Sequence, residues 1–220
     1  MLYGIKYRIA RLLDLAGSRG FQYTKDVRAS IQKAVYRRTF MSKAIDDLKH
    51  DHEAILSALG ILDQIAIDID KDHNPSKADL VSFIGFLKEF ADKCHHGKEE
   101  GILFPAMTEA GIPERGGPIG VMLSEHIQGR DFIKQMEHAL ASTIDYKGFA
   151  VAAKKYSSLL GSHIEKENSI LFPMAERTLE ATQLESLYAS FEEHEERVIG
   201  HGRHEELHRT LKELRLKYVK

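Results

Sequence analysis

The chain has little of several features that define common protein classes. It contains one cysteine, Cys94, and no tryptophan. A single cysteine excludes an intramolecular disulfide framework and any zinc or iron–sulfur site built from several cysteines. No apolar run approaches the ~18 residues of a transmembrane helix, and no secretory leader pattern is present, so we expect a cytoplasmic protein without membrane contact. The net charge of −2 argues against dedicated nucleic-acid binding.

Histidine, in contrast, is abundant. Twelve histidines accompany 33 acidic residues in a chain of 220 residues, of which 43% are hydrophobic. That apolar content is sufficient for a sizeable buried core. Because histidine is both the usual metal ligand and the usual pH-sensitive group, the positions of these residues decide what their number means.

The charge changes along the chain. Residues 1–40 hold nine lysines or arginines and two aspartates, whereas residues 41–220 hold 22 basic and 31 acidic residues. We therefore expect three parts: a basic N-terminal extension (1–40), a central domain (41–180) and a C-terminal extension (181–220). The extension at 1–40 has three interpretations: a transit peptide, a helical arm, or a reading frame that begins upstream of a true start at Met41.

From residue 42 onward the apolar residues recur at helical spacing. Helices are predicted at about 42–68, 77–110, 119–141 and 148–179, with Ser76 capping the second. Further helices are predicted at about 181–199 and from 203 to 218. Short loops between the first four imply antiparallel neighbours. The predicted fold class is thus all-α, an up-down-up-down four-helix bundle with additional C-terminal helices.

A repeat carries the chemistry. Residues 95–105 read HHGKEEGILFP and residues 163–173 read HIEKENSILFP, with seven identical positions at an offset of 68. Each copy places a histidine four residues before a glutamate, on one helical face. The preceding helices carry His52 and His126 on their apolar stripes, so the protein is predicted to be a duplicated helical hairpin.

Four histidines and two glutamates are therefore predicted to point into the bundle core: His52, His95, Glu99, His126, His163 and Glu167. Burying carboxylates is costly unless a cation is shared among them. Two histidines for each of two metals, with bridging carboxylates, match a di-metal site of iron, manganese or zinc. The alternative is that these are core histidines with satisfied hydrogen bonds, and that the bundle is purely structural.

At these residues the chain resembles the hemerythrin-like HHE cation-binding family over about residues 42–180. The resemblance implies two iron ions, bridged by Glu99, Glu167 and an oxo or hydroxo group. His52 and His95 would complete one iron, and His126 and His163 the other. It also implies a small diatomic ligand or peroxide that is bound, sensed or reduced, with an iron store or a metal-dependent regulatory module as the alternative.

The residues depart from the oxygen-carrying hemerythrins, which have a fifth histidine four residues after the third-helix ligand, where this chain has Arg130. The set is closer to di-iron proteins thought to repair iron–sulfur centres, whose additional N-terminal domain carries a cysteine that residues 1–40 lack.

The remaining candidates have more ordinary interpretations. His96 and Glu100 are expected at the rim of the site, with a role in orienting the ligands as the alternative. Cys94 is expected to be a buried small residue. The C-terminal histidines at 194, 201, 204 and 208 are interpreted as parts of a solvated, charge-paired helix, with a weak surface metal site as the alternative.

Overall fold

The computed structural model describes the backbone of residues 25–219 and the side chains of residues 43–219. Its first described helix, α2 (Lys25–Asp70), passes through the predicted boundary near Met41 without a break. The expectations for residues 1–24 lie outside the described residues. Within the described part of the chain, no helix is long and apolar enough to cross a bilayer.

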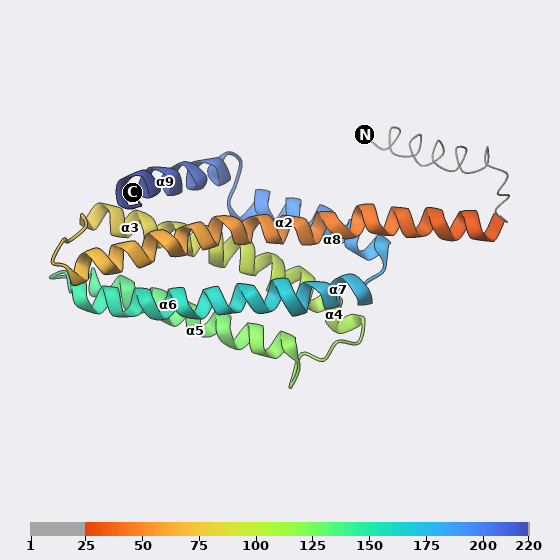
Figure 1. The fold of residues 1–220 in the computed structure, drawn as a ribbon, viewed down its shortest axis with the longest axis horizontal. Helices are drawn as coiled ribbons and strands as arrows, with labels where there is room; N and C mark the ends of the chain where they lie inside the picture. The colour runs from red at the N-terminus through yellow and green to blue at the C-terminus, as the bar shows by residue number, and fades with distance from the viewer. Residues whose placement is uncertain (1–24, 220) are drawn as a thin grey trace.

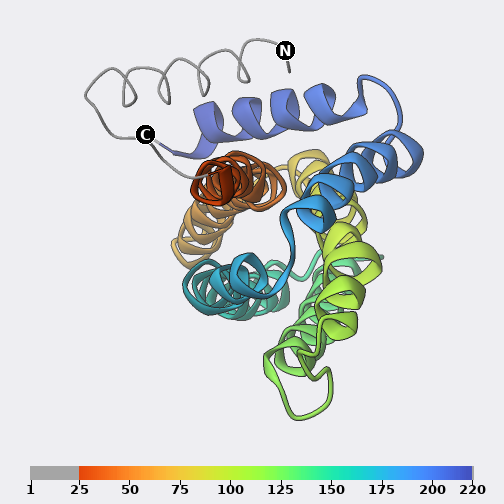
Figure 2. The ribbon, with the colours of Figure 1, turned by 90° about the vertical axis from the view of Figure 1, so that its right-hand side faces the viewer.

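Four long helical segments run alternately up and down, as predicted (Figures 1 and 2). The first is α2 and the third is α5 (Pro118–Ala139). The second consists of α3 (Lys77–Phe86), η1 (Leu87–His96), η2 (Glu99–Leu103) and α4 (Phe104–Glu109). The fourth consists of α6 (Tyr146–Lys166), η3 (Glu167–Leu171) and α7 (Phe172–Thr178). The helix pattern read from the apolar spacing is confirmed.

Local sequence explains where these segments begin. Ser76 Oγ accepts a hydrogen bond from the backbone amide of Asp79, which confirms the predicted cap of α3. Asp145 caps α6 in the same way through the amide of Gly148. Between α4 and α5, Gly111 and Gly116 have positive φ values of 95° and 73°, a region that glycine adopts without a steric penalty.

Both copies of the repeat contain a π-helical turn at the same place. The amide of Phe104 donates to the carbonyl of Glu99, and that of Phe172 to the carbonyl of Glu167, in each case five residues back. A proline follows each phenylalanine and lacks the amide that an α-helix requires. The Leu-Phe-Pro ending therefore favours the wider turn, and π turns of this kind are frequent at functional sites.

Among the described side chains, the core consists of two apolar clusters separated along the bundle axis. One cluster contains Ile55, Ile133 and Leu160, and the other contains Leu48 and Met122. On α2, His52 lies between Leu48 of one cluster and Ile55 of the other. The predicted metal ligands thus form a polar layer with hydrocarbon on both sides.

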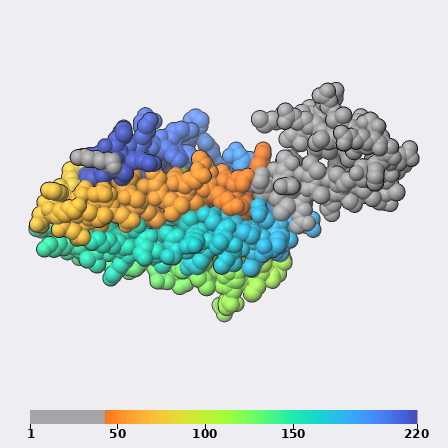
Figure 3. Space-filling view, in the orientation of Figure 1, coloured from red at the N-terminus to blue at the C-terminus, as the bar shows by residue number. Residues whose placement is uncertain are grey.

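Two C-terminal helices, α8 (Ala181–Val198) and α9 (Arg203–Tyr218), pack outside the bundle. Figure 3 shows α9 lying directly against α2. The interpretation of this stretch as a solvated helix is wrong for one face. Leu207, Leu211 and Leu214 are buried in the apolar cluster that contains Ile55. Their spacing of four and three residues places them in one apolar stripe on a helix. The many charged residues around them make this stripe hard to recognise in the sequence.

Candidate metal centre

All six predicted ligands lie in the polar layer. Each of the four long segments contributes, and every one of the six residues is 0–1% exposed. The first segment supplies His52 and the third supplies His126. The second and fourth segments supply the histidine–glutamate pairs of the repeat.

The ligating atoms form two groups, each within 4.8 Å of one another. The first cluster is His52, His95, Glu99 and Glu167. The second cluster is His96, Glu99, His126 and His163. The histidine pairing expected from the family resemblance, His52 with His95 and His126 with His163, is the pairing that the fold brings together.

Each glutamate faces one histidine from each cluster. Glu167 Oε2 lies 3.2 Å from Nε2 of His52 and 3.2 Å from Nε2 of His163. The carboxylate of Glu99 lies 3.7 Å from Nε2 of His95 and 3.5 Å from Nε2 of His126. A carboxylate between two groups of imidazoles is the arrangement that a bridging ligand requires.

The other ring nitrogen of each predicted histidine ligand, Nδ1, donates a hydrogen bond to an oxygen outside the layer. The partners and distances are Asn168 at 3.0 Å for His52, Asp51 at 3.2 Å for His95, Glu100 at 2.7 Å for His126 and Glu125 at 2.9 Å for His163. These bonds fix the tautomer that leaves an Nε2 lone pair pointing inward, as in many metal-bound histidines.

These four bonds involve equivalent positions in the two halves of the repeat. Asp51 directly precedes His52, and Glu125 directly precedes His126. Each of these acids holds the histidine of the next segment. Asn168 and Glu100 follow the two glutamates, and they hold the histidines of α2 and α5. The bonds therefore link segment one to two, two to three, three to four and four to one, forming a closed hydrogen-bond ring around the bundle.

Basic side chains compensate the outer acids. The Lys98 side chain is 1% exposed, and its Nζ lies 2.9 Å from Asp47, 3.1 Å from Asp51 and 3.2 Å from Glu195 of α8. In the second copy, Lys166 pairs with Glu125. Arg130 donates to Glu100 and to Asp92, at 2.8 Å and 2.7 Å. The charges that orient the histidines are thus neutralised away from the centre.

The electrostatics keep most of the site ready for a cation. Burial lowers the pKa of His95 to about 4 and lowers that of His126, so both imidazoles are neutral at pH 7. Burial also opposes the charge on His163, but the facing Glu167 and Glu125 outweigh it and raise its pKa. Burial and the nearby Glu167 raise the pKa of Glu99 well above its usual range. For Glu167, the facing His163 and His52 outweigh burial and lower the pKa.

Many polar atoms in this layer have no hydrogen-bond partner. Among the described side chains, the buried atoms without a partner include one nitrogen each of His52 and His95 and both carboxylate oxygens of Glu99 and Glu167. Orphaned buried groups cost roughly 1–3 kcal/mol each. A shared cation satisfies all of them, since imidazole nitrogens and carboxylate oxygens are suitable ligands for iron, manganese or zinc. The residues therefore fit a metal centre.

Sequence reasoning misplaced His96. It was expected at the rim, yet it is 3% exposed and stacks on His126 with ring centroids 3.9 Å apart. The π-helical segment η1 has a wider turn than an α-helix, so neighbouring His95 and His96 both face inward. Glu100 is partly exposed and orients His126, which agrees with the alternative interpretation of that residue.

Other functional residues were missed entirely. Asp51, Glu125 and Lys98 were not singled out, although two signals existed: an acid precedes a histidine at both 51–52 and 125–126, and a lysine occupies the same place in both repeats. Cys94 is buried as expected, and burial raises its pKa to about 12. His204 and His208 pack against the ring of Phe90.

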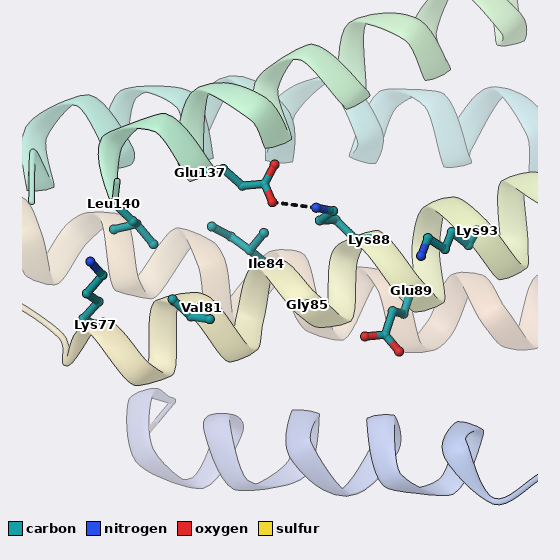
Figure 4. Close-up of a pocket in the computed structure, with 9 residues that line it drawn as sticks. All are labelled: Lys77, Val81, Ile84, Gly85, Lys88, Glu89, Lys93, Glu137 and Leu140. Carbon is teal, nitrogen blue, oxygen red and sulfur yellow. Dashed lines mark hydrogen bonds and ion pairs between the residues drawn. The ribbon is translucent and has the colours of Figure 1, made fainter. Parts of the chain in front are cut away.

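A separate surface pocket of about 450 Å³ lies between α3, η1 and the end of α5. Figure 4 shows its lining, in which Lys88 of η1 reaches Glu137 of α5 at 2.6 Å. None of the residues that line it belongs to the polar layer, so this pocket is not the entrance to the metal centre.

Comparison with known proteins agrees with this geometry. The hemerythrin HHE cation binding domain matches residues 43–175 of the chain. A curated relative, the iron-sulfur cluster repair protein YtfE of Escherichia coli O81 (strain ED1a), is 32% identical over 88 residues. That match covers 37% of this chain and 40% of the relative. The search of solved structures gave no match.

Proposed function

Since this chain belongs to the hemerythrin HHE cation-binding domain family, we propose that it is a non-haem di-iron protein that binds, senses or reduces a small molecule. Oxygen, nitric oxide and peroxide are the proposed ligands. The similarity to a protein named for iron–sulfur cluster repair supports iron as the metal. The proposal also places the protein in the cytoplasm and assigns it no nucleic-acid or membrane partner.

The observation that carries the proposal is the layer of unpartnered atoms between the two apolar clusters. Two carboxylates and the Nε2 atoms of two imidazoles are buried there without hydrogen bonds. A purely structural bundle would gain stability from apolar residues at these positions. The retained polar layer is understandable if cations complete it.

The proposed ligands are the six residues predicted from sequence. His52 and His95 would hold one iron, His126 and His163 the other, and Glu99 and Glu167 would bridge them with an oxo or hydroxo group. When bound, iron supplies the redox chemistry and the open position for a small ligand. Manganese and zinc suit the same donors.

The chain's own residues define what surrounds that chemistry. Asp51, Glu100 and Glu125 each accept the Nδ1 proton of one histidine, and Asn168 accepts that of His52, so every ring has a fixed orientation with Nε2 facing inward. Phe172 stacks on His52 with ring centroids 5.3 Å apart, and Phe104 stacks on His126 at 6.0 Å. These rings exclude bulk water on the side of the Leu-Phe-Pro turns, which favours small ligands over large ones.

A second candidate function is iron storage or metal-dependent regulation without turnover. The observation that favours it is Glu195, which connects α8 to Lys98 and thereby to the Asp51–His95 pair. Metal occupancy would then influence how α8 is held.

Metal analysis tests the proposal. Purified protein is expected to contain about two irons per chain and to show near-ultraviolet absorption from an oxo bridge. His95→Ala and Glu167→Ala are expected to lose iron, whereas His50→Ala is the control because the His50 side chain is 71% exposed. Full iron loading of either ligand variant would refute the assignment. Many irons per chain would favour storage, and rapid consumption of nitric oxide or peroxide would argue against it.

A further inference from the structure

The two halves of the site differ in one group of residues, which we call the polar corner: His96, Asp92, Arg130 and Glu100. Superposing the repeats by sequence pairs His95 with His163, Glu99 with Glu167 and Lys98 with Lys166, so these positions are the same in both halves. Four other positions are polar or charged in one half and mostly apolar in the other. The pairs are His96 with Ile164, Asp92 with Leu160, Arg130 with Leu56 and Glu100 with Asn168.

His96 is the innermost residue of that polar corner. Its side chain is buried, and both of its ring nitrogens lack a hydrogen-bond partner. Asp92 is 3.5 Å from Nδ1 of His96, beyond a good hydrogen bond, and the same Asp92 oxygen is occupied by Arg130 at 2.7 Å. A neutral imidazole needs at least one partner for its N–H or its lone pair, so the protein alone leaves His96 unsatisfied.

Packing does not explain this histidine. Its counterpart Ile164 is 2% exposed and belongs to the apolar cluster that contains Ile55. A branched hydrocarbon therefore fits the equivalent place in the other half. The ring of His96 instead stacks on that of His126 at an interplanar angle of 17°. His96 also contributes one potential ligand atom to the second cluster.

We propose that His96 is a fifth histidine ligand, which coordinates the second metal together with Glu99, His126 and His163. The proposal rests on the di-metal centre proposed above. It makes the two metals inequivalent, with three imidazoles on one and two on the other. Histidine is also absent where oxygen-carrying hemerythrins have their fifth one: Arg130 stands there and binds Glu100 and Asp92. The second segment, and not the third, thus supplies the additional imidazole.

The variant that tests this is His96→Ile, because it copies the residue of the other half and fills the site with a hydrocarbon side chain that is buried at the equivalent position. The full-length protein is loaded with ⁵⁷Fe, and metal content, metal affinity and Mössbauer spectra are measured. Wild type is expected to show two unequal iron environments. In His96→Ile the second metal is expected to bind more weakly, by more than the roughly 10–100-fold cost of losing a residue that only orients a ligand. Its two iron environments are expected to become alike.

A second variant separates ligation from positioning. His96→Ala leaves space beside His126, and added imidazole is expected to restore both the affinity and the two unequal signals. Asp92→Asn is the matched control, since it alters the neighbour of His96 and keeps the imidazole of His96 itself. Circular dichroism confirms that each variant is helical.

The outcomes are distinct. If wild type binds two equivalent irons, or if His96→Ile leaves affinity and spectrum unchanged, His96 is not a ligand while the proposed function stands. Failure of imidazole to change His96→Ala also counts against ligation. If wild type binds no metal, the proposed function fails and this inference fails with it.

Discussion

His126 and His163 face each other nitrogen to nitrogen, with their Nε2 atoms 3.0 Å apart inside the bundle. Each ring already donates its Nδ1 proton to an outer carboxylate, of Glu100 and Glu125 respectively. Two inward lone pairs at this distance repel unless a proton or a cation lies between them. The raised pKa of His163 means that a proton can fill this place, and a metal ion competes with that proton.

Removal of metal is therefore expected to destabilise the bundle. A ligand present at 100 times its dissociation constant adds about 2.7 kcal/mol to stability. For a chain of this size that corresponds to a fall in Tm of roughly 5–10 °C on chelation, with recovery when iron is returned. Thermal melts followed by circular dichroism, with metal content checked at each step, measure this effect. An unchanged Tm in verified metal-free protein would contradict it.

The two glutamates are expected to respond oppositely to removal of their charge in the metal-free protein. Burial and Glu167 make a charge on Glu99 unfavourable, so Glu99→Gln is expected to stabilise the apo protein by about 1–3 kcal/mol. Glu167 is held as a carboxylate by His52 and His163, so Glu167→Gln is expected to destabilise it. Urea unfolding of both variants gives the two signs. Shifts of the same sign would show that this electrostatic assignment is wrong.

The advantage of Glu99→Gln is expected to depend on pH. Because the folded-state pKa of Glu99 is raised, its penalty exists only above the unfolded-state pKa of about 4.3 and grows as pH rises toward the folded value. The difference in unfolding free energy between the variant and wild type should be present at pH 7 and should vanish near pH 4. Comparing the two apo proteins at each pH cancels the titration of groups that do not interact with Glu99. A difference that is independent of pH would assign the effect to packing.

Lys98 and Lys166 occupy the same place in the two repeats but differ in burial. Lys98 is 1% exposed, and its removal leaves the buried carboxylate of Asp51 without its cation, which costs about 3–5 kcal/mol. The Lys166 side chain is 35% exposed, and loss of its pair with Glu125 costs about 0–1 kcal/mol. Urea unfolding of Lys98→Met and Lys166→Met tests the contrast. Equal losses would mean that burial of Lys98 does not determine its contribution.

Asp51 connects that lysine to the metal centre. Burial opposes its charge, but the bond from His95 and the nearby Lys98 lower its pKa to about 2. Asp51→Asn keeps an acceptor beside His95 but removes the charge, so metal affinity is expected to fall about 10–100-fold. Isothermal titration with zinc measures this without redox chemistry. Asp46→Asn, at an exposed position of the same helix, is the control.

Sequence periodicity was sufficient to predict the helices and the burial of the six residues proposed as ligands. The apolar stripe around His52 runs from Leu48 to Ile55, and the structure buries all three. The same reasoning failed where the helix changes its winding. An α-helical period would place Ile170, three residues after Glu167, on the inward face of the fourth segment. Ile170 is instead 52% exposed, whereas Phe172, five residues after Glu167, is fully buried. A period of 3.6 residues does not describe a π turn.

His96 was misplaced for the same reason, since an α-helical wheel puts it about 100° from His95. The outer acids required a different kind of information. Asp51 lies next to His52 in sequence but serves His95, on another segment, because adjacent residues of one helix point to different neighbours. Such partners follow only from the packing of helix pairs, which the sequence repeat reflects but does not specify.

The closed hydrogen-bond ring has a consequence for symmetry. Each of its bonds within a hairpin has a counterpart in the other hairpin, and each bond between hairpins has a counterpart that runs the opposite way. Two identical copies of one hairpin, related by a twofold axis, would close the same ring. Such a dimer would have to carry the same residue at the positions of His96 and Ile164. Joining the two hairpins in one chain removes that requirement, so the two halves are free to carry different residues at these positions.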